Sequence, residues 1–394
     1  MRATILALTG LATLAAAGPA AAAFPDCVAD LKAAAVGRGV DRSIADQALD
    51  IAAPDEDVLR ISQVQPEFKT PIWDYLAFLV DDQRIADGRD RLQEHSDLLR
   101  RVEAAYGVPA EIVLAVWGVE TDYGRTKGGY FLPHALATLA CATDRRPDFW
   151  RGELLAALDL VDRGDLQLDE LYGSWAGAFG QTQFIPSTYA RLAVDFDGDG
   201  RRDLVRSVPD ALASTANYLK RAGWRPGASW LYEVKAPDGY RGPRGRKERA
   251  SLDSWDRRGI VRADGAPLSG PEQAGLLLPA GPEGPGFLVF PNFDAIYAYN
   301  HAESYALAIS HLADRIAGYP GLRTPWPTDD PGLSRAQRLD LQKRLLAKGY
   351  DIGEADGMIG PATRAGIEAA ERDLGLPVTG RAGQKIYRAL GGAG

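Results

Sequence analysis

The sequence predicts a mainly helical protein with a small strand-containing insertion and a separate helical unit at its C-terminus. Apolar residues recur at helical spacing over most of the chain before residue 230. Between residues 230 and 290, Gly and Pro become frequent and short β-prone pieces such as Phe287-Leu288-Val289-Phe290 appear. A Pro-rich stretch over residues 319–332 then precedes a final segment with helical patterning. These three observations define the fold class and its division.

Length and charge restrict the function classes. The chain has 394 residues, of which 46% are hydrophobic and 25% charged, as in soluble globular proteins. It is too long for one domain of typical size, so two or three units are expected. The net charge of −8 provides no basic footprint for nucleic acid, so nucleic-acid binding is not expected.

The N-terminus has the pattern of a secretory signal peptide. Arg2 precedes a short apolar run, and an Ala-rich stretch ends at Ala23, after which we place the cleavage site. The apolar run is shorter than the roughly 20 residues that a membrane span needs. Phe24-Pro25-Asp26 does not resemble the approach to a lipid-attachment site at Cys27. We therefore expect an exported, periplasmic protein with no stable membrane insertion and no lipid anchor.

Helical patterning continues through the mature chain. It covers residues 26–53, 90–106, 150–161, 208–222 and 305–317. Gly107 ends the second of these helices, and Pro109 opens the next one, which carries Glu120. Residues 230–290 are predicted to form a strand-and-loop insertion, and residues 333–394 a compact unit of two or three helices.

Glu120 is the most unusual residue in these helices. In VLAVWGVETDYG, residues 113–124, it lies on the same helical stripe as Val113, Val116 and Trp117. Gly124 ends the helix, and a carboxylate near the negative end of a helix is disfavoured in its ionised form. Partial burial would raise its pKa further, as a general acid needs. The alternative is an ordinary solvated or paired Glu.

The only two cysteines, Cys27 and Cys141, both lie in the mature chain. In an oxidising compartment only one pairing is available, and two separately buried thiols are the alternative. A disulfide would close a loop of more than a hundred residues, which stabilises by about 4–5 kcal/mol on the chain-entropy model.

An acidic loop follows a Gly-rich turn. Residues 195–206, DFDGDGRRDLVR, have carboxylates at loop positions one, three, five and nine, and Gly200 at position six. That spacing is typical of a Ca²⁺ loop of the EF-hand type, although Arg206 replaces the Glu at position twelve. Asp210 is the nearest carboxylate that could replace it. A solvated acidic turn is the alternative. The preceding glycines, at positions 173, 177 and 180, allow either a ligand or tight packing.

These motifs together resemble the lytic murein transglycosylase B family. The match consists of GVETDYG, GAFGQTQFIPSTY, VDFDGDGRRDL, ANYL, Asn292-Phe293 and YNHAESYALAISHLADRI, spread over residues 24–320. Residues 341–380 resemble the type 1 peptidoglycan-binding domain, with its DGxxGPxTR core intact as residues 356–364. This segment departs at Glu371, where Gln is usual, and at Thr379, where Asp is common.

The resemblance implies a lysozyme-like α+β catalytic domain in which Glu120 is the sole catalytic acid/base. It would cleave the β-1,4 bond between N-acetylmuramic acid and N-acetylglucosamine and leave 1,6-anhydromuramic ends, without consuming water. Asp122, two residues further along, is poorly placed to be a second carboxylate. By the resemblance, the substrate-binding residues are Tyr75, Ser174, Gln183, Tyr218, Tyr299 and Asn300. For each aromatic residue, packing in the core is the alternative.

The implied cofactor is one structural Ca²⁺, with no organic cofactor. Its expected ligands are Asp195, Asp197, Asp199, Arg201 and Asp210. The expected domains are a signal peptide (1–23), a catalytic domain (24–320), a Pro-rich linker (321–332) acting as a semi-rigid spacer, and a peptidoglycan-binding domain (333–394) that folds alone and tethers the enzyme to the wall.

The expected partner is the glycan strand of peptidoglycan, and the expected state is a monomer, with cell-wall enzyme complexes as an open alternative. Two other functions stay open at this point. One is a hydrolytic muramidase on the same fold, and the other is a wall-binding protein without activity.

Overall fold

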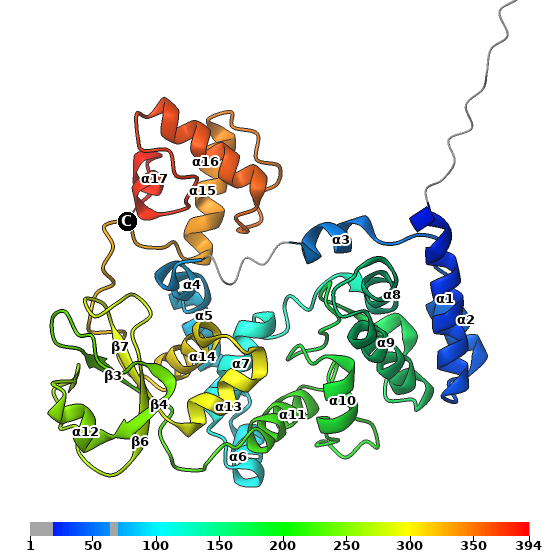
Figure 1. Cartoon of the computed structure of the whole chain (residues 1–394), viewed down its shortest axis with the longest axis horizontal. Helices are drawn as coiled ribbons and strands as arrows, with labels where there is room; N and C mark the ends of the chain where they lie inside the picture. Colours follow the sequence, from blue (N-terminus) through cyan, green and yellow to red (C-terminus); the bar gives the residue numbers. More distant parts are fainter. Residues whose placement is uncertain (1–18, 64–69, 394) are drawn as a thin grey trace, which may run out of the picture. The chain divides into compact units, whose positions relative to one another are not determined.

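The computed structural model describes residues 19–63 and 70–393, with side chains from Phe24 onward, and divides into two compact units (Figure 1). The first unit comprises the described part of residues 1–64 together with residues 129–178 and 185–187, and the second unit comprises the remainder. The predicted mainly helical class with a small sheet is confirmed. Residues 1–18 of the expected signal peptide lie outside the described residues.

The first unit is a group of helices with one short antiparallel strand pair. Its elements are α1 (Pro19–Gly37), α2 (Arg42–Ala48), α3 (Glu56–Ser62), β1 (Tyr130–Phe131), α8 (Leu132–Ala142), α9 (Pro147–Asp162), the 3₁₀ turn η2 (Leu168–Glu170) and β2 (Tyr172–Gly173). Cys27 of α1 and Cys141 of α8 form a disulfide, as predicted. This bond joins segments 114 residues apart in the sequence.

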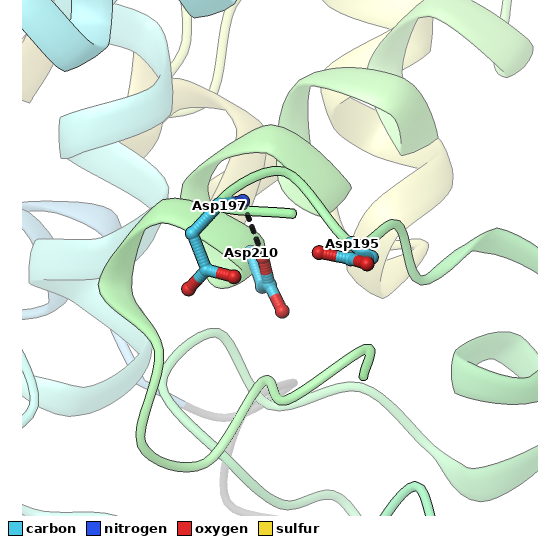
Figure 2. A group of neighbouring side chains, drawn as sticks. All are labelled: Asp195, Asp197 and Asp210. Carbon is cyan, nitrogen blue, oxygen red and sulfur yellow. Dashed lines mark hydrogen bonds between the residues drawn. The ribbon is translucent and has the colours of Figure 1, made fainter. Parts of the chain in front are cut away.

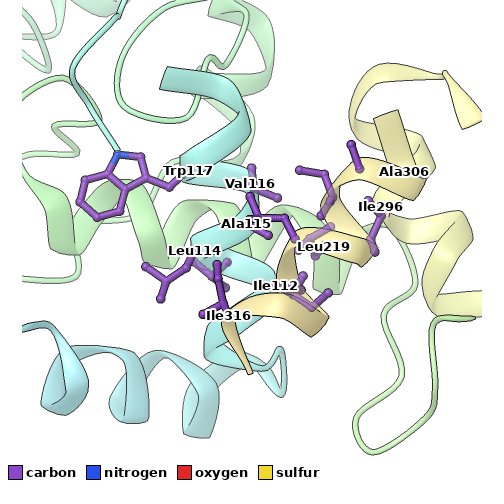
Figure 3. Close-up of a cluster of buried hydrophobic side chains, with 14 of the residues drawn as sticks. Ile112, Leu114, Ala115, Val116, Trp117, Leu219, Ile296, Ala306 and Ile316 are labelled. Carbon is purple, nitrogen blue, oxygen red and sulfur yellow. The ribbon is translucent and has the colours of Figure 1, made fainter. Parts of the chain in front are cut away.

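The second unit contains a largely buried helix, α7, whose apolar side chains form the centre of its core (Figure 3). The other helices before the C-terminal domain are α4 (Ile72–Leu79), α5 (Asp82–Glu94), α6 (Ser96–Tyr106), α10 (Pro186–Leu192, which begins in the first unit), α11 (Val208–Arg221), α12 (Leu252–Arg257), α13 (Pro291–Asn300) and α14 (Glu303–Ile316). Helix α7 (Ala110–Thr121) packs against α5, α6, α11 and α14, and its residues 112–116 are fully buried. A helix that is apolar on all sides belongs in a core. The stripe predicted from Val113, Val116 and Trp117 is therefore part of a wholly buried surface, which ends just before Glu120.

Helix boundaries differ from the prediction in two places. The helix expected over residues 90–106 is two helices, because α5 ends at Glu94 and α6 begins at Ser96, with His95 between them. The helical region expected over residues 26–53 is likewise split between α1 and α2, since Gly39 adopts a left-handed φ of 103°.

The strand-and-loop insertion is a five-stranded antiparallel sheet with the order β4-β6-β7-β3-β5. Its strands are β3 (Leu231–Lys235), β4 (Gly245–Ser251), β5 (Val261–Arg262), β6 (Gln273–Leu277) and β7 (Gly286–Val289). Trp255 of α12 and Leu276 and Leu288 of the sheet are fully buried in a core of their own. The sheet leads directly into α13, which carries Tyr299 and Asn300.

The C-terminal domain has three helices, α15 (Arg335–Ala347), α16 (Pro361–Asp373) and α17 (Gln384–Ala389), around a separate apolar core. The two departures from the resembled domain contact each other. The buried Glu371 accepts hydrogen bonds from the backbone N–H and the hydroxyl of Thr379, both at 2.6 Å. Each of the two unusual residues therefore provides hydrogen-bond partners for the other, and the local fold is preserved.

The Pro-rich segment before this domain, predicted as a semi-rigid spacer, packs against other parts of the second unit. Leu322 and Trp326 pack against the core of the second unit, and the ring centroid of Trp326 lies 6.4 Å from that of Trp73 in α4. Asp330 accepts hydrogen bonds from Arg381 and from the backbone N–H of Lys385. Proline restricts a chain but does not keep it from packing when apolar side chains alternate with it.

Among the described residues, no single helix is long and apolar enough to cross a membrane. The pair α6 and α7 passes the test of length and composition together, but the two helices meet at an angle of 110°.

Candidate active site

Glu120 lies in the last turn of α7 and is half-buried. The helix stops abruptly after it, because Asp122, Tyr123 and Gly124 all adopt positive φ values, of 52°, 58° and 84°. Two of these are not glycines, so the surrounding structure must hold the turn against a backbone preference. The side chain of Glu120 is thus presented from a fixed helix end.

Gln181 holds this turn from the outside. Its Oε1 accepts a hydrogen bond of 3.1 Å from the indole N–H of Trp117, and its backbone carbonyl accepts one of 2.5 Å from the hydroxyl of Thr121. A Cβ on Gly124 would lie only 2.3 Å from that Oε1, so the position requires glycine for space as well as for φ. The Gly-rich turn around residue 180 therefore acts as a support for the end of α7.

Tyr305 is the direct partner of Glu120, and the sequence analysis did not single it out. Its hydroxyl donates a hydrogen bond of 2.5 Å to Oε1 of Glu120. Burial, together with the negative charge of Glu120, raises the pKa of Tyr305 well above 10, so the phenol stays protonated. Tyr305 lies in the motif YNHAESY, but nothing in its helical spacing distinguishes it from the core residues around it.

An aromatic group continues from Tyr305. Its ring stacks on Tyr299 with 6.2 Å between centroids and 12° between planes, and Tyr218 lies 4.7 Å from Tyr299. The hydroxyls of Tyr299 and Tyr218 donate to the backbone carbonyls of Thr182 and Ala298, each at 2.6 Å. The structure therefore brings two of the predicted substrate-binding residues together beside Glu120, with their hydroxyls already bonded.

The other predicted residues of the second unit lie at the edges of this group. Tyr75 is half-buried on α4, and its charge interaction with Tyr305 contributes to the raised pKa of that phenol. Gln183 has a positive φ of 53°, and its amide N–H₂ donates to the carbonyls of Lys127 and Gly180 at 3.2 and 3.1 Å. Asn300 is exposed at the end of α13, next to Tyr299.

Ser174 belongs to the first unit, where it organises a tight turn after β2. Its hydroxyl oxygen accepts a hydrogen bond of 3.0 Å from the N–H of Ala178, and its carbonyl accepts one of 3.0 Å from Gly177. Gly177 adopts a φ of 85°, and a Cβ there would meet Leu136 at 2.7 Å.

Asp122, the carboxylate nearest to Glu120 in the sequence, is held in ion pairs. Its oxygens lie 2.5 Å from Nη1 of Arg335, 3.2 Å from Nη1 of Arg125 and 3.5 Å from Nε of Arg84. Both carboxylate oxygens of Asp122 are therefore engaged by guanidinium groups. This arrangement agrees with the expectation that Asp122 is not a second catalytic carboxylate.

The acidic loop gathers three of its carboxylates. Oxygens of Asp195, Asp197 and Asp210 lie within 4.8 Å of one another (Figure 2). Asp210, at the start of α11, accepts hydrogen bonds from the backbone N–H groups of Phe196 and Asp203 at 2.7 and 2.8 Å. Burial raises its pKa in spite of these bonds. Three carboxylates this close repel one another unless a cation lies between them, and hard oxygen donors suit Ca²⁺.

Asp199 and Arg201, also predicted as ligands, are not members of this carboxylate group. The Asp199 carboxylate accepts a hydrogen bond of 2.8 Å from the N–H of Arg201, which closes the loop. Gly198 and Gly200 have φ values of 81° and 90°, as the sharp turn in such loops requires. Asp203, at loop position nine, instead accepts hydrogen bonds from Val205 and Arg206.

The loop is connected to the end of α7. Two loop residues that follow Asp203, Leu204 and Val205, provide backbone carbonyls that bind Gln181. The carbonyl of Leu204 accepts a hydrogen bond of 2.8 Å from the backbone N–H of Gln181, and that of Val205 accepts one of 3.1 Å from its side-chain amide. Gln181 in turn holds Trp117 and Thr121. A change in the conformation of the loop can therefore alter the turn after Glu120 through Gln181.

Comparison with known proteins gives one family over most of the chain. The family described as "Transglycosylase SLT domain" matches residues 23–314, and the "Putative peptidoglycan binding domain" matches residues 334–390. The membrane-bound lytic murein transglycosylase B of Escherichia coli (strain K12) is 35% identical over 292 residues, which cover 71% of this chain and 79% of that protein.

Solved structures agree with this result. SltB3 from Pseudomonas aeruginosa, in complex with NAG-NAM-pentapeptide or with NAG-anhNAM-pentapeptide, is 43% identical, with a TM-score of 0.74, and the match covers 93% of this chain and 99% of that one. The E. coli lytic transglycosylase Slt35 in complex with calcium is 32% identical, with a TM-score of 0.65, over 76% of this chain and 93% of that one. The chain therefore belongs to the transglycosylase SLT domain family and carries a C-terminal domain of the peptidoglycan-binding family.

Proposed function

We propose that this protein is a lytic transglycosylase that cleaves the β-1,4 bond between N-acetylmuramic acid and N-acetylglucosamine in peptidoglycan, with Glu120 as its single acid and base. The observation that carries this assignment is the half-buried Glu120, held at a rigid helix end and bonded through one oxygen to Tyr305. The ion pairs of Asp122 add to it, because they occupy both oxygens of the other carboxyl group of this turn.

Glu120 takes part in two successive proton transfers. Glu120, protonated on Oε2, donates to the glycosidic oxygen and the N-acetylglucosamine leaves as an alcohol. The resulting carboxylate then accepts the proton of the C6 hydroxyl of the muramic acid, whose oxygen attacks C1 and closes the 1,6-anhydro ring. The acid is regenerated and no water is consumed. The acetamido group of the substrate can stabilise the positive charge at C1 between the two steps, as in substrate-assisted glycosidases.

Tyr305 is a positioning residue in this scheme. Its donated hydrogen bond fixes one carboxyl oxygen and so the orientation of the carboxyl group, and it stabilises the carboxylate that forms after the first step. The ring of Tyr299, which stacks on Tyr305, and the tilted ring of Tyr218 offer their faces and edges to the apolar faces of sugars. Gln183, Asn300, Ser174 and Tyr75 are assigned to hydrogen bonds and contacts with the acetamido and hydroxyl groups of the glycan.

We also assign a Ca²⁺ ion to the acidic loop. Asp195, Asp197 and Asp210 would hold it, with Asp199 and the backbone of Arg201 as further oxygen donors. The ion supplies charge that stabilises the loop. The loop residues that follow then hold Gln181, and through it the helix end that carries Glu120.

We keep the domain assignment that the sequence predicts: residues 1–23 as a signal peptide, 24–320 as the catalytic domain, 321–332 as a linker and 333–394 as the peptidoglycan-binding domain. The family matches over residues 23–314 and 334–390 support the two larger domains. Export to the periplasm is supported by the Cys27–Cys141 disulfide, since such bonds persist in oxidising compartments.

Product analysis tests the function directly. Purified sacculi are digested with the wild-type protein and with Glu120→Gln, and the fragments are identified by mass spectrometry. We expect anhydromuramic ends from the wild type alone. Reducing muramic acid ends would instead identify a hydrolase, and undigested sacculi would identify a wall-binding protein without activity.

A further inference from the structure

The C-terminal domain is joined to the rest of the second unit by charged side chains at two separate places. At the first, the guanidinium of Arg335, the first residue of α15, grips Asp81 through Nε at 2.6 Å and Nη2 at 3.1 Å, and donates from Nη1 to Asp122 at 2.5 Å. At the second, Arg381 donates to both carboxylate oxygens of Asp74 on α4, at 2.9 and 2.5 Å, and also binds Asp330.

The first contact reaches the turn after Glu120. Asp122 is the C-cap of α7, two residues after Glu120, and its φ of 52° is unfavourable for a residue other than glycine. Its side chain is only 16% exposed and that of Asp81 only 4%. Burial alone would raise the pKa of Asp81, but the hydrogen bond from Arg335 helps to hold it below its usual value. Arg335 therefore provides the positive charge opposite two largely buried carboxylates, those of Asp81 and Asp122.

The remaining partners of Asp122 cannot replace Arg335. The buried Arg84 donates from Nη1 to the carbonyls of Phe78 and Leu79, so its position is fixed by α4, and its Nε stays 3.5 Å from Asp122. Arg125 is shared with Asp87. Arg335 and Arg84 both contact Oδ1 of Asp122. Without Arg335, this oxygen would face only the more distant Arg84, and the left-handed turn would lose its shortest ion pair.

We propose that the C-terminal domain positions the catalytic acid: Arg335, acting through Asp122, holds the end of α7 so that Glu120 meets its substrate in the productive geometry. This proposal rests on the proposed role of Glu120 and goes beyond it. The domain then affects turnover itself, on soluble fragments as well as on intact wall. A tether alone would act only on the insoluble polymer, by raising its local concentration.

Two variants separate positioning from docking. Arg335→Gln removes the tie to Asp122, and Arg381→Gln removes an equal charge and a two-oxygen contact from the other docking point, on Asp74. With soluble glycan fragments that bear peptide stems, we expect Arg335→Gln to lower kcat about tenfold to a hundredfold with KM changed less than threefold. Arg381→Gln should keep kcat within threefold of wild type.

Two further variants keep the test sharp. Arg335→Lys retains the charge without the planar fork and should restore part of the lost kcat. Since Arg335 acts through Asp122, adding Arg335→Gln to Asp122→Asn should lower kcat no further than Asp122→Asn alone. Circular dichroism and thermal melting of each variant show whether it is folded, and Arg335→Lys takes the place of Arg335→Gln if the latter is not.

Failure of the positioning role of Arg335 can be distinguished from failure of the proposed transglycosylase function. Unchanged kcat in a folded Arg335→Gln protein, or equal losses in Arg335→Gln and Arg381→Gln, would overturn the positioning role. Either result leaves the anhydromuramic products of the wild type unaffected. Loss of the proposed function would instead be seen in the wild-type products themselves.

Discussion

The hydroxyl of Tyr305 lies 2.5 Å from Oε1 of Glu120, and Tyr305 is only 2% exposed. A buried phenol that cannot ionise near neutral pH can only donate to this oxygen. One oxygen of Glu120 is thereby fixed by Tyr305. The same contact stabilises the carboxylate that forms when Glu120 donates its proton, so it assists the first half of the reaction more than the second.

Tyr305→Phe should therefore lower kcat about tenfold to a hundredfold and leave KM almost unchanged, because a hydrogen bond to a charged group contributes roughly 1.5–3 kcal/mol. Initial rates on soluble glycan fragments measure the effect. Tyr240→Phe is the matched control, since it removes a phenol hydroxyl bonded to the carbonyl of Pro243 in the strand insertion. Equal rates for Tyr305→Phe and wild type would remove Tyr305 from the mechanism.

Glu120→Gln should reduce wall cleavage by about a thousandfold or more, since the amide keeps the shape but cannot donate a catalytic proton. Glu111→Gln, in the first turn of the same helix, should keep activity and serves as its control. Release of soluble muropeptides from sacculi is the measurement, and melting curves should show both variants folded. Activity of Glu120→Gln within tenfold of wild type would refute the assignment.

Ca²⁺ should raise the melting temperature by mass action on the folded state, by roughly 5 °C at a hundredfold excess over Kd. Asp195→Ala and Asp210→Asn should abolish this shift, whereas Asp238→Asn, an exposed Asp in another loop, should retain it. Differential scanning calorimetry with Ca²⁺ and with a chelator gives the comparison. A wild-type protein that melts identically in both would show that the loop is an acidic turn only.

The sequence was most informative where a motif combines spacing with residue type. The helix end before Gly124 and the gathering of Asp195, Asp197 and Asp210 follow from local patterns, the disulfide follows from the presence of only two cysteines, and all three are found in the structure. Local patterns have a limit in the linker, because a Pro-rich composition predicts a semi-rigid spacer but carries no information on the packing partners of Leu322 and Trp326.

Apart from the disulfide, contacts between distant segments could not be predicted. Tyr305 meets Glu120 across 185 residues, and Arg335 meets Asp122 across 213. Neither residue differs in type or spacing from its neighbours on an ordinary amphipathic helix, so only the packing of α14 and α15 identifies it. The same applies to Glu371 and Thr379, whose mutual hydrogen bonds make two departures from a motif compatible with its fold.

Thiol titration of the exported protein under denaturing, non-reducing conditions should find no free thiol, because Cys27 and Cys141 are bonded. Replacing both by Ser should lower the free energy of unfolding by about 2–4 kcal/mol. The effect should appear in the melting of the first unit, where both cysteines lie. Two reactive thiols in the exported wild type would contradict the pairing.

A final prediction concerns pH and two residues of α14 remote from the mechanism, Asp314 and His311. Both line a cavity of about 480 Å³ beside Trp230, whose indole N–H donates to Asp314 at 3.1 Å. Burial raises the pKa of Asp314 from 3.8 to about 7 and lowers the pKa of His311 from 6.5 to about 4. Folding therefore favours the neutral form of each.

The two residues act in opposite directions over nearly the same pH range. For Asp314 the folded state binds more protons than the unfolded state between about pH 3.8 and 7, so its contribution to stability falls as pH rises. For His311 the unfolded state binds more protons between about pH 4 and 6.5, so its contribution rises. Each residue changes the free energy of unfolding by an amount on the order of 3 kcal/mol over its pH range, and in the wild type the two opposite changes largely cancel.

Single substitutions should reveal them. Asp314→Asn removes the falling contribution, so its stability relative to wild type should increase as pH rises from 4.5 to 6.5. His311→Gln removes the rising contribution, so its stability relative to wild type should decrease over the same interval. Urea unfolding at several pH values gives both differences, and subtracting the wild-type curve cancels all other titrating groups. Differences that stay constant with pH, or slopes of the same sign in both variants, would show that burial does not set these two protonation states.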